Sequence, residues 1–307
     1  MSQRPRIAIT TSSFATFDRT PLNMLEQAGF TPQLNPLGRK LTAEETVAQV
    51  AGCVGVVAGT EPLTEKVLSS CPGLRVVSRC GVGMDNVDQA AAAGLGITVC
   101  NTPDGPTRAV AELTLAMALD LLRDVSRMDR ELRAGVWKKR MGFALQGKRL
   151  GIVGMGRIGQ AVAQTFAAMG TSVAYCDPVE APCCFPRLAL NELLMHSDIV
   201  CLHCSRPEGI CTLLDREALL TMPRGSWLIN CSRGGLVDEE ALYELLVSGH
   251  LAGAGLDVFD REPYQGPLLS LDNVVLTPHI GSYAREGRIQ MEIAAVQNAL
   301  DVLGNHA

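Results

Sequence analysis

A short glycine-rich stretch in the middle of the chain constrains the fold more than any other feature of the sequence. Leu150–Val153 is an apolar run, and Gly154, Gly156 and Gly159 follow it in the spacing G-x-G-x-x-G. From Arg157 onward, apolar residues recur at helical spacing, which indicates that a helix begins directly after the glycines. The stretch therefore predicts a strand, a tight turn and a helix, which together begin a βαβ unit.

Each glycine suits the binding of a dinucleotide. Gly154 permits the tight turn, Gly156 lets a pyrophosphate approach bare backbone, and Gly159 lets the helix pack closely on the strand. A second predicted strand, Ser172–Cys176, ends at Asp177, whose carboxylate can accept hydrogen bonds from both hydroxyls of an adenosine ribose. Because such a carboxylate repels a 2′-phosphate, the sequence favours NAD over NADP. A purely structural glycine turn is the alternative, and this spacing does not favour it.

Size and charge limit the classes of protein to consider. The chain has 307 residues, of which 47% are hydrophobic and 19% charged, so it can form two domains with separate cores. A net charge of −5 at pH 7 argues against nucleic acid or an anionic membrane as a partner. No apolar run approaches the roughly 18 residues that cross a bilayer. The N-terminal stretch enters a strand-like run without a secretory apolar region, so we expect a cytoplasmic protein.

The eleven cysteines are interpreted as reduced thiols. Most lie within or at the ends of apolar runs, where a thiol behaves as a small hydrophobic side chain. Cys201, His203 and Cys204 have a spacing that resembles a metal site, but no second pair of ligands completes it. We therefore expect no metal.

Strand-like and helix-like segments alternate through the first hundred residues, which predicts a parallel sheet covered by helices. Thr42 and Glu45 form a capping box at the start of the second helix. A cluster of helix-breaking residues at 101–106 marks the expected domain junction. The predicted strands are Ile7–Thr10, Pro32–Leu34, Val54–Val57, Arg75–Val77 and Ile97–Val99, and the predicted helices are Leu22–Gln27, Ala43–Ala51, Thr64–Ser69 and Val87–Ala93.

The same alternation continues after a long apolar helix at Val110–Leu122 and the glycine-rich stretch. A last helix at Ala284–Leu303 could return to the first domain. The predicted fold is α/β, with two doubly wound parallel-sheet domains flanking a cleft: a Rossmann domain at 101–281 and a flavodoxin-like domain at 1–100 and 282–307. The further strands are Ile199–Leu202, Trp227–Asn230, Gly253–Asp257 and Val274–Leu276, and the further helices are Asn191–Met195, Arg216–Leu220 and Glu239–Ser248.

Three polar residues that suit acid–base chemistry follow predicted strands in the second half of the chain: Arg233, Glu262 and His279. Reacting groups in such domains lie at the carboxyl ends of the strands. Arginine offers a fork for a carboxylate, histidine exchanges a proton near neutral pH, and glutamate can orient the imidazole. Each residue alone is more typical of a solvent-exposed loop. Their combination with the dinucleotide motif favours a catalytic set.

Taken in order, these motifs resemble the D-isomer-specific 2-hydroxyacid dehydrogenase family, which includes phosphoglycerate dehydrogenases. The resemblance covers nearly the whole chain. It rests on Arg79–Asp88, Asn101–Pro103, Gly154–Gly159, Asp177, Asn230–Glu239, Gly255–Pro263 and Pro278–Gly281.

The resemblance implies a role for each matching residue in the reduction of a small 2-keto acid by NADH, or in the reverse oxidation. His279 would be the general acid/base, Glu262 its partner, and Arg233 the residue that binds the substrate carboxylate and polarises the carbonyl. The substrate domain would contribute Arg79, Val82 and Gly83. The NAD contacts would come from Gly154, Gly156, Arg157, Ile158, Gly159, Asp177, Cys231, Ser232, Asp257 and Gly281, with Asp257 at the nicotinamide carboxamide.

The sequence also departs from the family in ways that leave alternatives open. The segment 177–190 is shorter than in relatives, so its helix is expected to be a loop. Ala58 stands near the position where phosphoglycerate dehydrogenases carry an arginine, whereas Arg79 matches a basic position of that subgroup. Glyoxylate, hydroxypyruvate or pyruvate are therefore favoured, with 3-phosphoglycerate dehydrogenase as the alternative. A third hypothesis is an NADH-sensing interaction protein similar to the corepressors of this family.

The resemblance further implies a homodimer. The helix at Val110–Leu122 and the loop toward Gly142 resemble the region through which family members dimerise. The alternative is a helix that is buried within the monomer.

Overall fold

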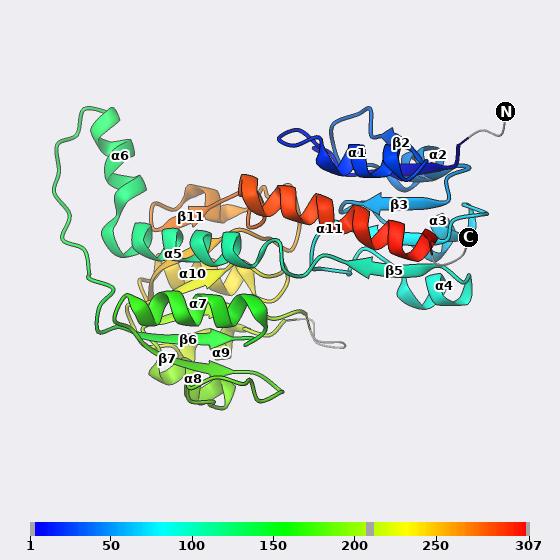
Figure 1. The fold of residues 1–307 in the computed structure, drawn as a ribbon. Helices are drawn as coiled ribbons and strands as arrows, with labels where there is room; N and C mark the ends of the chain where they lie inside the picture. Colours follow the sequence, from blue (N-terminus) through cyan, green and yellow to red (C-terminus); the bar gives the residue numbers. More distant parts are fainter. Residues whose placement is uncertain (1–3, 207–211, 305–307) are drawn as a thin grey trace. The chain divides into compact units, whose positions relative to one another are not determined.

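The chain forms two compact α/β units in the computed structural model, which describes residues 4–206 and 212–304 (Figure 1). The first unit runs to Pro106 and resumes at Ser282, and the second is Thr107–Gly281. Each unit contains one sheet in which every strand pairing is parallel. The predicted fold class, with two doubly wound parallel-sheet domains, is confirmed.

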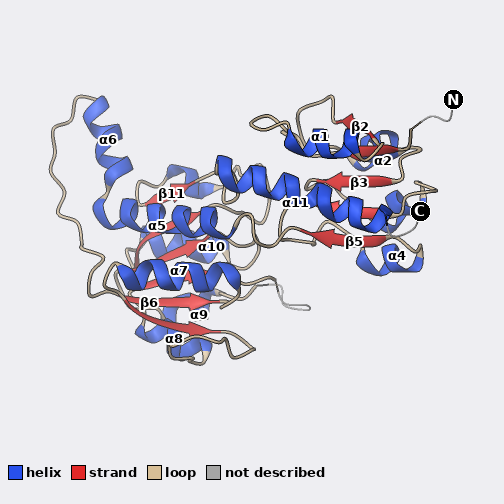
Figure 2. Ribbon diagram, viewed as in Figure 1, coloured by secondary structure: helices blue, strands red, loops and turns tan. Residues whose placement is uncertain are grey.

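The sheet of the first unit has the strand order β2-β1-β3-β4-β5. Buried residues of α1 and α11 pack on one face of this sheet, and those of α2, α3 and α4 pack on the other (Figure 2). The strands are β1 (Arg6–Ile9), β2 (Thr31–Leu34), β3 (Gly55–Ala58), β4 (Val76–Arg79) and β5 (Thr98–Asn101), and the helices are α1 (Thr20–Gln27), α2 (Ala43–Val50), α3 (Glu65–Ser69), α4 (Gln89–Gly94) and α11 (Arg285–Gly304).

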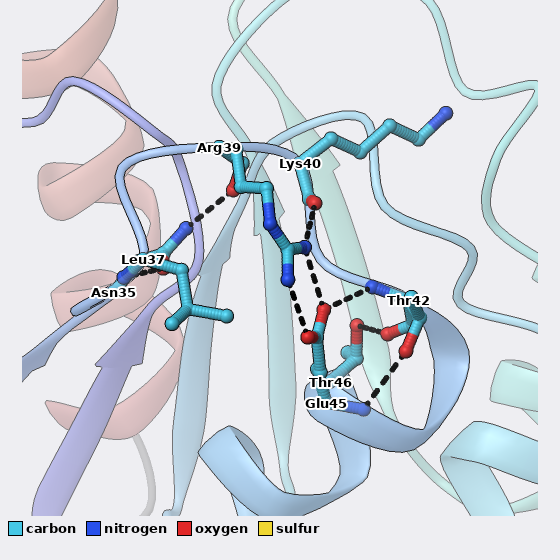
Figure 3. Close-up of polar contacts among 7 residues, drawn as sticks. All are labelled: Asn35, Leu37, Arg39, Lys40, Thr42, Glu45 and Thr46. Atoms are coloured by element: carbon cyan, nitrogen blue, oxygen red, sulfur yellow. Dashed lines mark hydrogen bonds and ion pairs between the residues drawn. The ribbon is translucent and has the colours of Figure 1, made fainter.

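The start of α2 has the predicted capping box (Figure 3). Thr42 Oγ1 accepts a hydrogen bond from the backbone N–H of Glu45, and the Glu45 carboxylate accepts one from the Thr42 N–H at 2.8 Å. Arg39 donates two further bonds to the same carboxylate, at 2.8 and 2.6 Å. Hydrogen bonding to Arg39 is the main reason that the pKa of Glu45 falls to about 2. This network fixes the loop that leads from β2 into α2.

The sheet of the second unit has the strand order β11-β10-β9-β8-β6-β7. Buried residues of α5 and α7 pack on one face, and those of α8, α9 and α10 pack on the other. The strands are β6 (Arg149–Val153), β7 (Ser172–Cys176), β8 (Ile199–Leu202), β9 (Ser226–Asn230), β10 (Leu251–Leu256) and β11 (Val274–Leu276), and the helices are α5 (Thr107–Arg123), α6 (Val125–Arg133), α7 (Arg157–Ala168), α8 (Leu190–His196), α9 (Arg216–Thr221), α10 (Glu239–Val247) and the 3-10 turn η1 (Pro267–Ser270).

Two segments of the second unit depart from the regular alternation of strands and helices that pack on the sheet. Asp124 adopts a left-handed conformation with φ 52°, which ends α5 and lets α6 begin in a new direction. None of the residues of α6 is buried, and Figure 1 shows α6 and the chain after it standing apart from the sheet. Residues 177–189 contain no helix, in agreement with the loop expected there.

Within residues 4–206 and 212–304, no helix is both long enough and apolar enough to cross a membrane.

Candidate active site

The glycine turn between β6 and α7 has the geometry that a pyrophosphate needs. Gly154 has φ +94°, and a Cβ at this position would lie 2.6 Å from the backbone of the chain leaving β8. A Cβ at Gly159 would lie 2.0 Å from the carbonyl oxygen of Gly154, so only glycine allows this approach of helix and strand. At Gly156, by contrast, nothing lies within 4 Å of the point that a methyl group would occupy.

The open space at Gly156 lies where α7 begins. Gly156 is the N-cap of α7, and Arg157, Ile158 and Gly159 form its first turn. The N–H groups of a first turn have no partner within their own helix and carry the positive end of the helix dipole. These residues therefore fit the pyrophosphate of a dinucleotide.

Asp177 follows β7 and lies next to the glycine turn. One carboxylate oxygen accepts a hydrogen bond from the Met155 N–H at 2.7 Å, and the other accepts one from the Val179 N–H at 2.9 Å. The acid is thus held in a fixed orientation at the edge of the predicted ribose site. Sequence reasoning placed Asp177 there but did not foresee its bond to the turn itself.

The turn after β9 carries Arg233. Asn230 is buried at 2% exposure, and its amide donates to the Arg233 carbonyl oxygen at 2.8 Å, while its side-chain oxygen accepts from the N–H and the hydroxyl of Ser232. A Cβ at Gly234 would lie 1.8 Å from the carbonyl oxygen of Phe259, which requires glycine where this turn meets the chain after β10. Burial raises the pKa of the Cys231 thiol to about 12, so this thiol stays protonated.

Asp257, directly after β10, is a buried acid that several hydrogen bonds hold in place. It is 1% exposed, and its carboxylate accepts hydrogen bonds from the Thr277 hydroxyl at 2.5 Å, the Ile280 N–H at 2.7 Å and the Gly281 N–H at 2.7 Å. These three donors flank His279, which has the unusual φ of +55°. Asp257 therefore fixes the loop that presents His279.

His279 and Glu262 form the hydrogen-bonded pair that the sequence suggested. His279 Nδ1 lies 3.1 and 3.0 Å from the two carboxylate oxygens of Glu262. The His279 side chain is 48% exposed and that of Glu262 is 40% exposed. A carboxylate beside Nδ1 favours the tautomer that carries the proton on this nitrogen. The pair has the form of a general acid/base with its orienting acid.

In the first unit, the turn after β4 carries the other predicted site residues. Arg79 donates to the carbonyl oxygen of Cys80, and the Asn101 amide donates to the carbonyl oxygen of Val82 at 2.8 Å. The N–H of Gly81 donates to the Thr102 hydroxyl at 2.7 Å. These bonds shape the turn and fix the backbone that leads to Gly83.

Two residues near the candidate site have structural features that the sequence does not indicate. Asn230 appears only as the start of a motif, although its amide holds the arginine turn together. His203 lies at the end of β8 with both ring nitrogens buried and without hydrogen-bond partners among the described residues. Burial lowers its pKa to about 4, so the ring is neutral at neutral pH. In the part of the chain that the structure describes, no three His, Cys, Asp or Glu side chains gather in a way that could hold a metal.

Comparison with known proteins agrees with this arrangement of residues. The family model described as the D-isomer specific 2-hydroxyacid dehydrogenase, NAD binding domain, matches residues 115–281. The hydroxypyruvate reductase of Thermotoga maritima is 38% identical over 257 residues, which cover 81% of this chain and 84% of that protein. A crystal structure of a protein from Thermus thermophilus superposes with a TM-score of 0.90 at 41% identity, covering 98% of this chain and 97% of the other.

A longer relative is also similar. The D-3-phosphoglycerate dehydrogenase of Mycobacterium leprae is 41% identical over 231 residues, which cover 73% of this chain and 44% of that protein. The chain therefore matches less than half of the length of that enzyme.

The chain belongs to the D-isomer specific 2-hydroxyacid dehydrogenase family. It is an oxidoreductase of 2-hydroxyacids that uses a nicotinamide cofactor, and the family resemblance and the NAD cofactor inferred from the sequence are confirmed.

Proposed function

We propose that this enzyme reduces a small 2-keto acid such as glyoxylate, hydroxypyruvate or pyruvate, with His279 as the general acid. The observation that carries the proposal is the pairing of His279 Nδ1 with both oxygens of Glu262 at 3.1 and 3.0 Å. This pairing orients the ring and leaves Nε2 for the substrate oxygen. In the reductive direction, Nε2 donates a proton to the developing alkoxide, and in the oxidative direction it accepts one from the alcohol.

The remaining roles follow from residue chemistry and from the family. Bound NADH supplies a hydride to the keto carbon. Arg233 binds the substrate carboxylate through its planar fork and polarises the carbonyl. We assign further substrate contacts to Arg79 and to the backbone of Val82 and Gly83. The local bonds that shape the turn after β4 support this assignment.

The cofactor contacts are proposed at the carboxyl ends of the strands of the second unit. The open space at Gly156 and the first turn of α7 support a pyrophosphate contact there. Asp177 is assigned to the adenosine ribose. We assign the nicotinamide side to Cys231, Ser232, Asp257 and Gly281. Cys231 and Ser232 would act through the backbone, because the Cys231 thiol is buried against Met117 and the Ser232 hydroxyl donates to Asn230.

The substrate is tested by initial rates of NADH and NADPH oxidation with glyoxylate, hydroxypyruvate, pyruvate and 3-phosphohydroxypyruvate. We expect one of the first three acids to give the highest kcat/KM. A clear preference for 3-phosphohydroxypyruvate would instead support a phosphoglycerate dehydrogenase, the alternative to which the similarity of the M. leprae enzyme lends weight. Tight NADH binding without turnover of any acid would favour an NADH-sensing interaction protein.

The role of His279 is tested by His279→Ala. We expect kcat to fall by about 10²- to 10⁴-fold while NADH still binds, because removal of a general acid leaves the cofactor site intact. His196→Ala is the matched control, since His196 is exposed at the end of α8. Turnover that survives the loss of His279 would overturn the assignment.

We also propose that the enzyme assembles as a homodimer. The sequence suggested an interface of the helix at Val110–Leu122 and the loop toward Gly142, but many residues of α5 are buried within the second unit. We therefore place the interface at α6 and residues 134–146. Trp137 is 82% exposed and Met141 is 97% exposed, and large apolar side chains gathered on a surface are typical of an interface. Light scattering at two concentrations should give a dimer mass for the wild type and a monomer mass for Trp137→Glu. A monomer mass for the wild type at both concentrations would contradict the proposal.

Finally, we propose the cytoplasm as the compartment. The ten cysteines in the described part of the chain are all free thiols, and several of them are buried in the cores. Free thiols are typical of proteins in a reducing compartment. Fractionation of cells that express the tagged protein tests this proposal, and recovery from a secreted or membrane fraction would contradict it.

A further inference from the structure

The turn after β10 is exposed at the point where it carries Glu262. Phe259 is 8% exposed and stacks on Tyr264 with 4.5 Å between the ring centroids, whereas residues 260–263 are exposed. A segment with few buried apolar contacts is held weakly unless hydrogen bonds tie it to the body of the protein. The direction in which Glu262 points therefore depends on hydrogen bonds to this turn.

One such bond reaches the turn from Glu239, the first residue of α10. Its Oε1 accepts from the Asp260 N–H at 2.8 Å. Burial raises the pKa of the Glu239 carboxyl, and the bond from Asp260 opposes this rise. The bond therefore favours the charged carboxylate, which is a stronger acceptor than a neutral group. It ties the turn to a helix two residues before Glu262.

The start of α10 is a firm support for this bond. Asp238 caps the helix by accepting from the N–H groups of Glu240 and Ala241 at 3.1 and 3.0 Å. The N–H of Asp238 in turn donates to the Leu214 carbonyl at 3.0 Å. The position of Glu239 is thus fixed by the cap and by the core beneath the helix. The buried residues of α10 are Ala241, Leu242, Leu245 and Leu246.

The peptide unit that joins Phe259 to Asp260 is held on both sides. A Cβ at Gly234 would lie 1.8 Å from the Phe259 carbonyl oxygen, so this oxygen lies directly on the turn after β9. The N–H of the same peptide unit is the one that bonds to Glu239. Residues 234–239 therefore hold both polar atoms of a single peptide unit in the turn after β10.

The held peptide unit leads to the proposed acid–base pair. The Phe259 N–H donates to Glu262 Oε1 at 3.3 Å, and the same oxygen lies 3.1 Å from His279 Nδ1. We propose that Glu239 is a positioning residue, which holds the turn after β10 so that the Glu262 carboxylate meets the ring of His279. Glu239 acts through Glu262 in this role. The inference rests on the proposed function, in which His279 exchanges the proton.

Two variants of the full-length protein that differ in one acceptor test the inference. Glu239→Gln keeps an oxygen for the Asp260 N–H, whereas Glu239→Met has a similar length without that oxygen. We expect Glu239→Met to lower kcat by about 10- to 100-fold and Glu239→Gln to stay within about threefold of the wild type, because a small displacement of a catalytic group is costly. Calorimetric titration with NADH should give unchanged affinity and stoichiometry in both variants.

A double-mutant cycle separates positioning from general structural damage. Glu262→Gln should itself lower kcat. Glu239→Met combined with Glu262→Gln should have nearly the kcat of Glu262→Gln alone, because the effect of Glu239 passes through Glu262. Losses that multiply in the double variant would show an independent structural role and would overturn the inference.

Glu240→Ala is the matched control, because Glu240 is an exposed acid in the same first turn of α10. It removes a similar interaction with the helix dipole and should leave kcat unchanged. Wild-type kcat in Glu239→Met, or equal losses in Glu239→Met and Glu239→Gln, would overturn the inference. Should Glu239→Met fail to fold, Glu239→Ala replaces it in the cycle. An unchanged kcat in Glu262→Gln would refute the proposed pair of Glu262 and His279, whereas multiplied losses refute the role of Glu239 alone.

Discussion

At the scale of single residues, Asp257 links the stability of the second unit to its proposed chemistry. Sequence similarity implied a contact with the nicotinamide for this residue. The structure shows that its carboxylate also accepts three hydrogen bonds from the loop that carries His279. The position of His279, the proposed general acid, therefore depends on a buried carboxylate that follows β10 rather than β11.

Replacement of Asp257 by asparagine should loosen this loop. An asparagine has one oxygen and one NH₂ group, so at least one backbone N–H would face a donor rather than an acceptor. We expect the free energy of unfolding to fall by about 1–3 kcal/mol and kcat to fall more than tenfold. Urea denaturation and initial rates measure both. Asp272→Asn is the control, because Asp272 is 65% exposed, and equal effects of the two variants would refute this account.

His203 should make the stability of the protein sensitive to mild acid. Burial lowers its pKa from 6.5 to about 4. Between these two pH values the unfolded chain binds a proton that the folded chain does not, so the free energy of unfolding falls as the pH falls. The loss between pH 7 and pH 5 is on the order of 2 kcal/mol.

Urea denaturation at pH 7 and pH 5 checks this contribution. His203→Asn should reduce the difference in stability between the two pH values, whereas the same substitution at the exposed His196 should retain it. An unchanged pH dependence in His203→Asn would show that other groups, such as the carboxylates, cause the acid sensitivity.

At the scale of elements, two glycines at the junction of β6 and α7 have different roles. Gly159 is needed for the packing of the helix on the strand, and Gly156 leaves the space proposed for the cofactor. Gly159→Ala places a methyl 2.0 Å from the Gly154 carbonyl oxygen, so the strand and the helix must move apart, at a cost of about 1–3 kcal/mol. Gly156→Ala meets nothing within 4 Å and should change stability by less than about 1 kcal/mol. Its methyl group would instead occupy the space proposed for the pyrophosphate.

Thermal unfolding and NADH titration distinguish the two variants. We expect Gly156→Ala to bind NADH more than tenfold more weakly at almost unchanged stability, and Gly159→Ala to be destabilised before any cofactor is added. Normal NADH affinity in Gly156→Ala would place the cofactor elsewhere.

Some elements could be predicted from the sequence and others could not, for physical reasons. The buried strands are short apolar runs, and β6, α7 and β7 are additionally marked by glycines and by Asp177, so they occur close to where they were predicted. Helix α6 was missed. Its apolar residues Val125, Met128 and Leu132 recur at helical spacing, but its other residues are polar or charged and none of its residues is buried. The left-handed Asp124 that separates it from α5 leaves no pattern in the sequence.

In the candidate site, too, some features could be predicted from the sequence and others could not. His279, Glu262 and Arg233 could be named because each follows a predicted strand, and the structure brings His279 and Glu262 into contact. The bonds of Asp257 to the His279 loop, and of Asp177 to Met155, join segments that are far apart in the sequence. Such pairings depend on the order of the strands in the sheet. The hydrophobic periodicity of the sequence does not indicate this order.

At the scale of the whole molecule, one unit is a single continuous segment of the chain and the other is made of two segments. The second unit, Thr107–Gly281, is continuous and contains both of the cores that cover its sheet. The first unit needs the C-terminal helix: residues of α11 such as Met291, Val296 and Leu303 belong to the same buried cluster as Ile7 of β1. A fragment that ends at Pro106 keeps α1 but lacks α11, so it exposes the part of this sheet face that α11 covers.

We therefore expect opposite behaviour from two fragments. Residues 107–281 should fold alone, with a cooperative urea transition and NADH affinity within about tenfold of the full chain, because a domain with its own core folds independently. Residues 1–106 should remain unfolded, because an apolar sheet face without its helix loses on the order of 1.5–3 kcal/mol for each large side chain that is left in water. Circular dichroism and calorimetry decide both points, with Gly156→Ala in the larger fragment as the binding control. If residues 107–281 fail to fold, the second unit depends on the rest of the chain for its stability. If they fold without binding NADH, the cofactor site needs residues outside them, and the assignment of all proposed cofactor contacts to this unit is wrong.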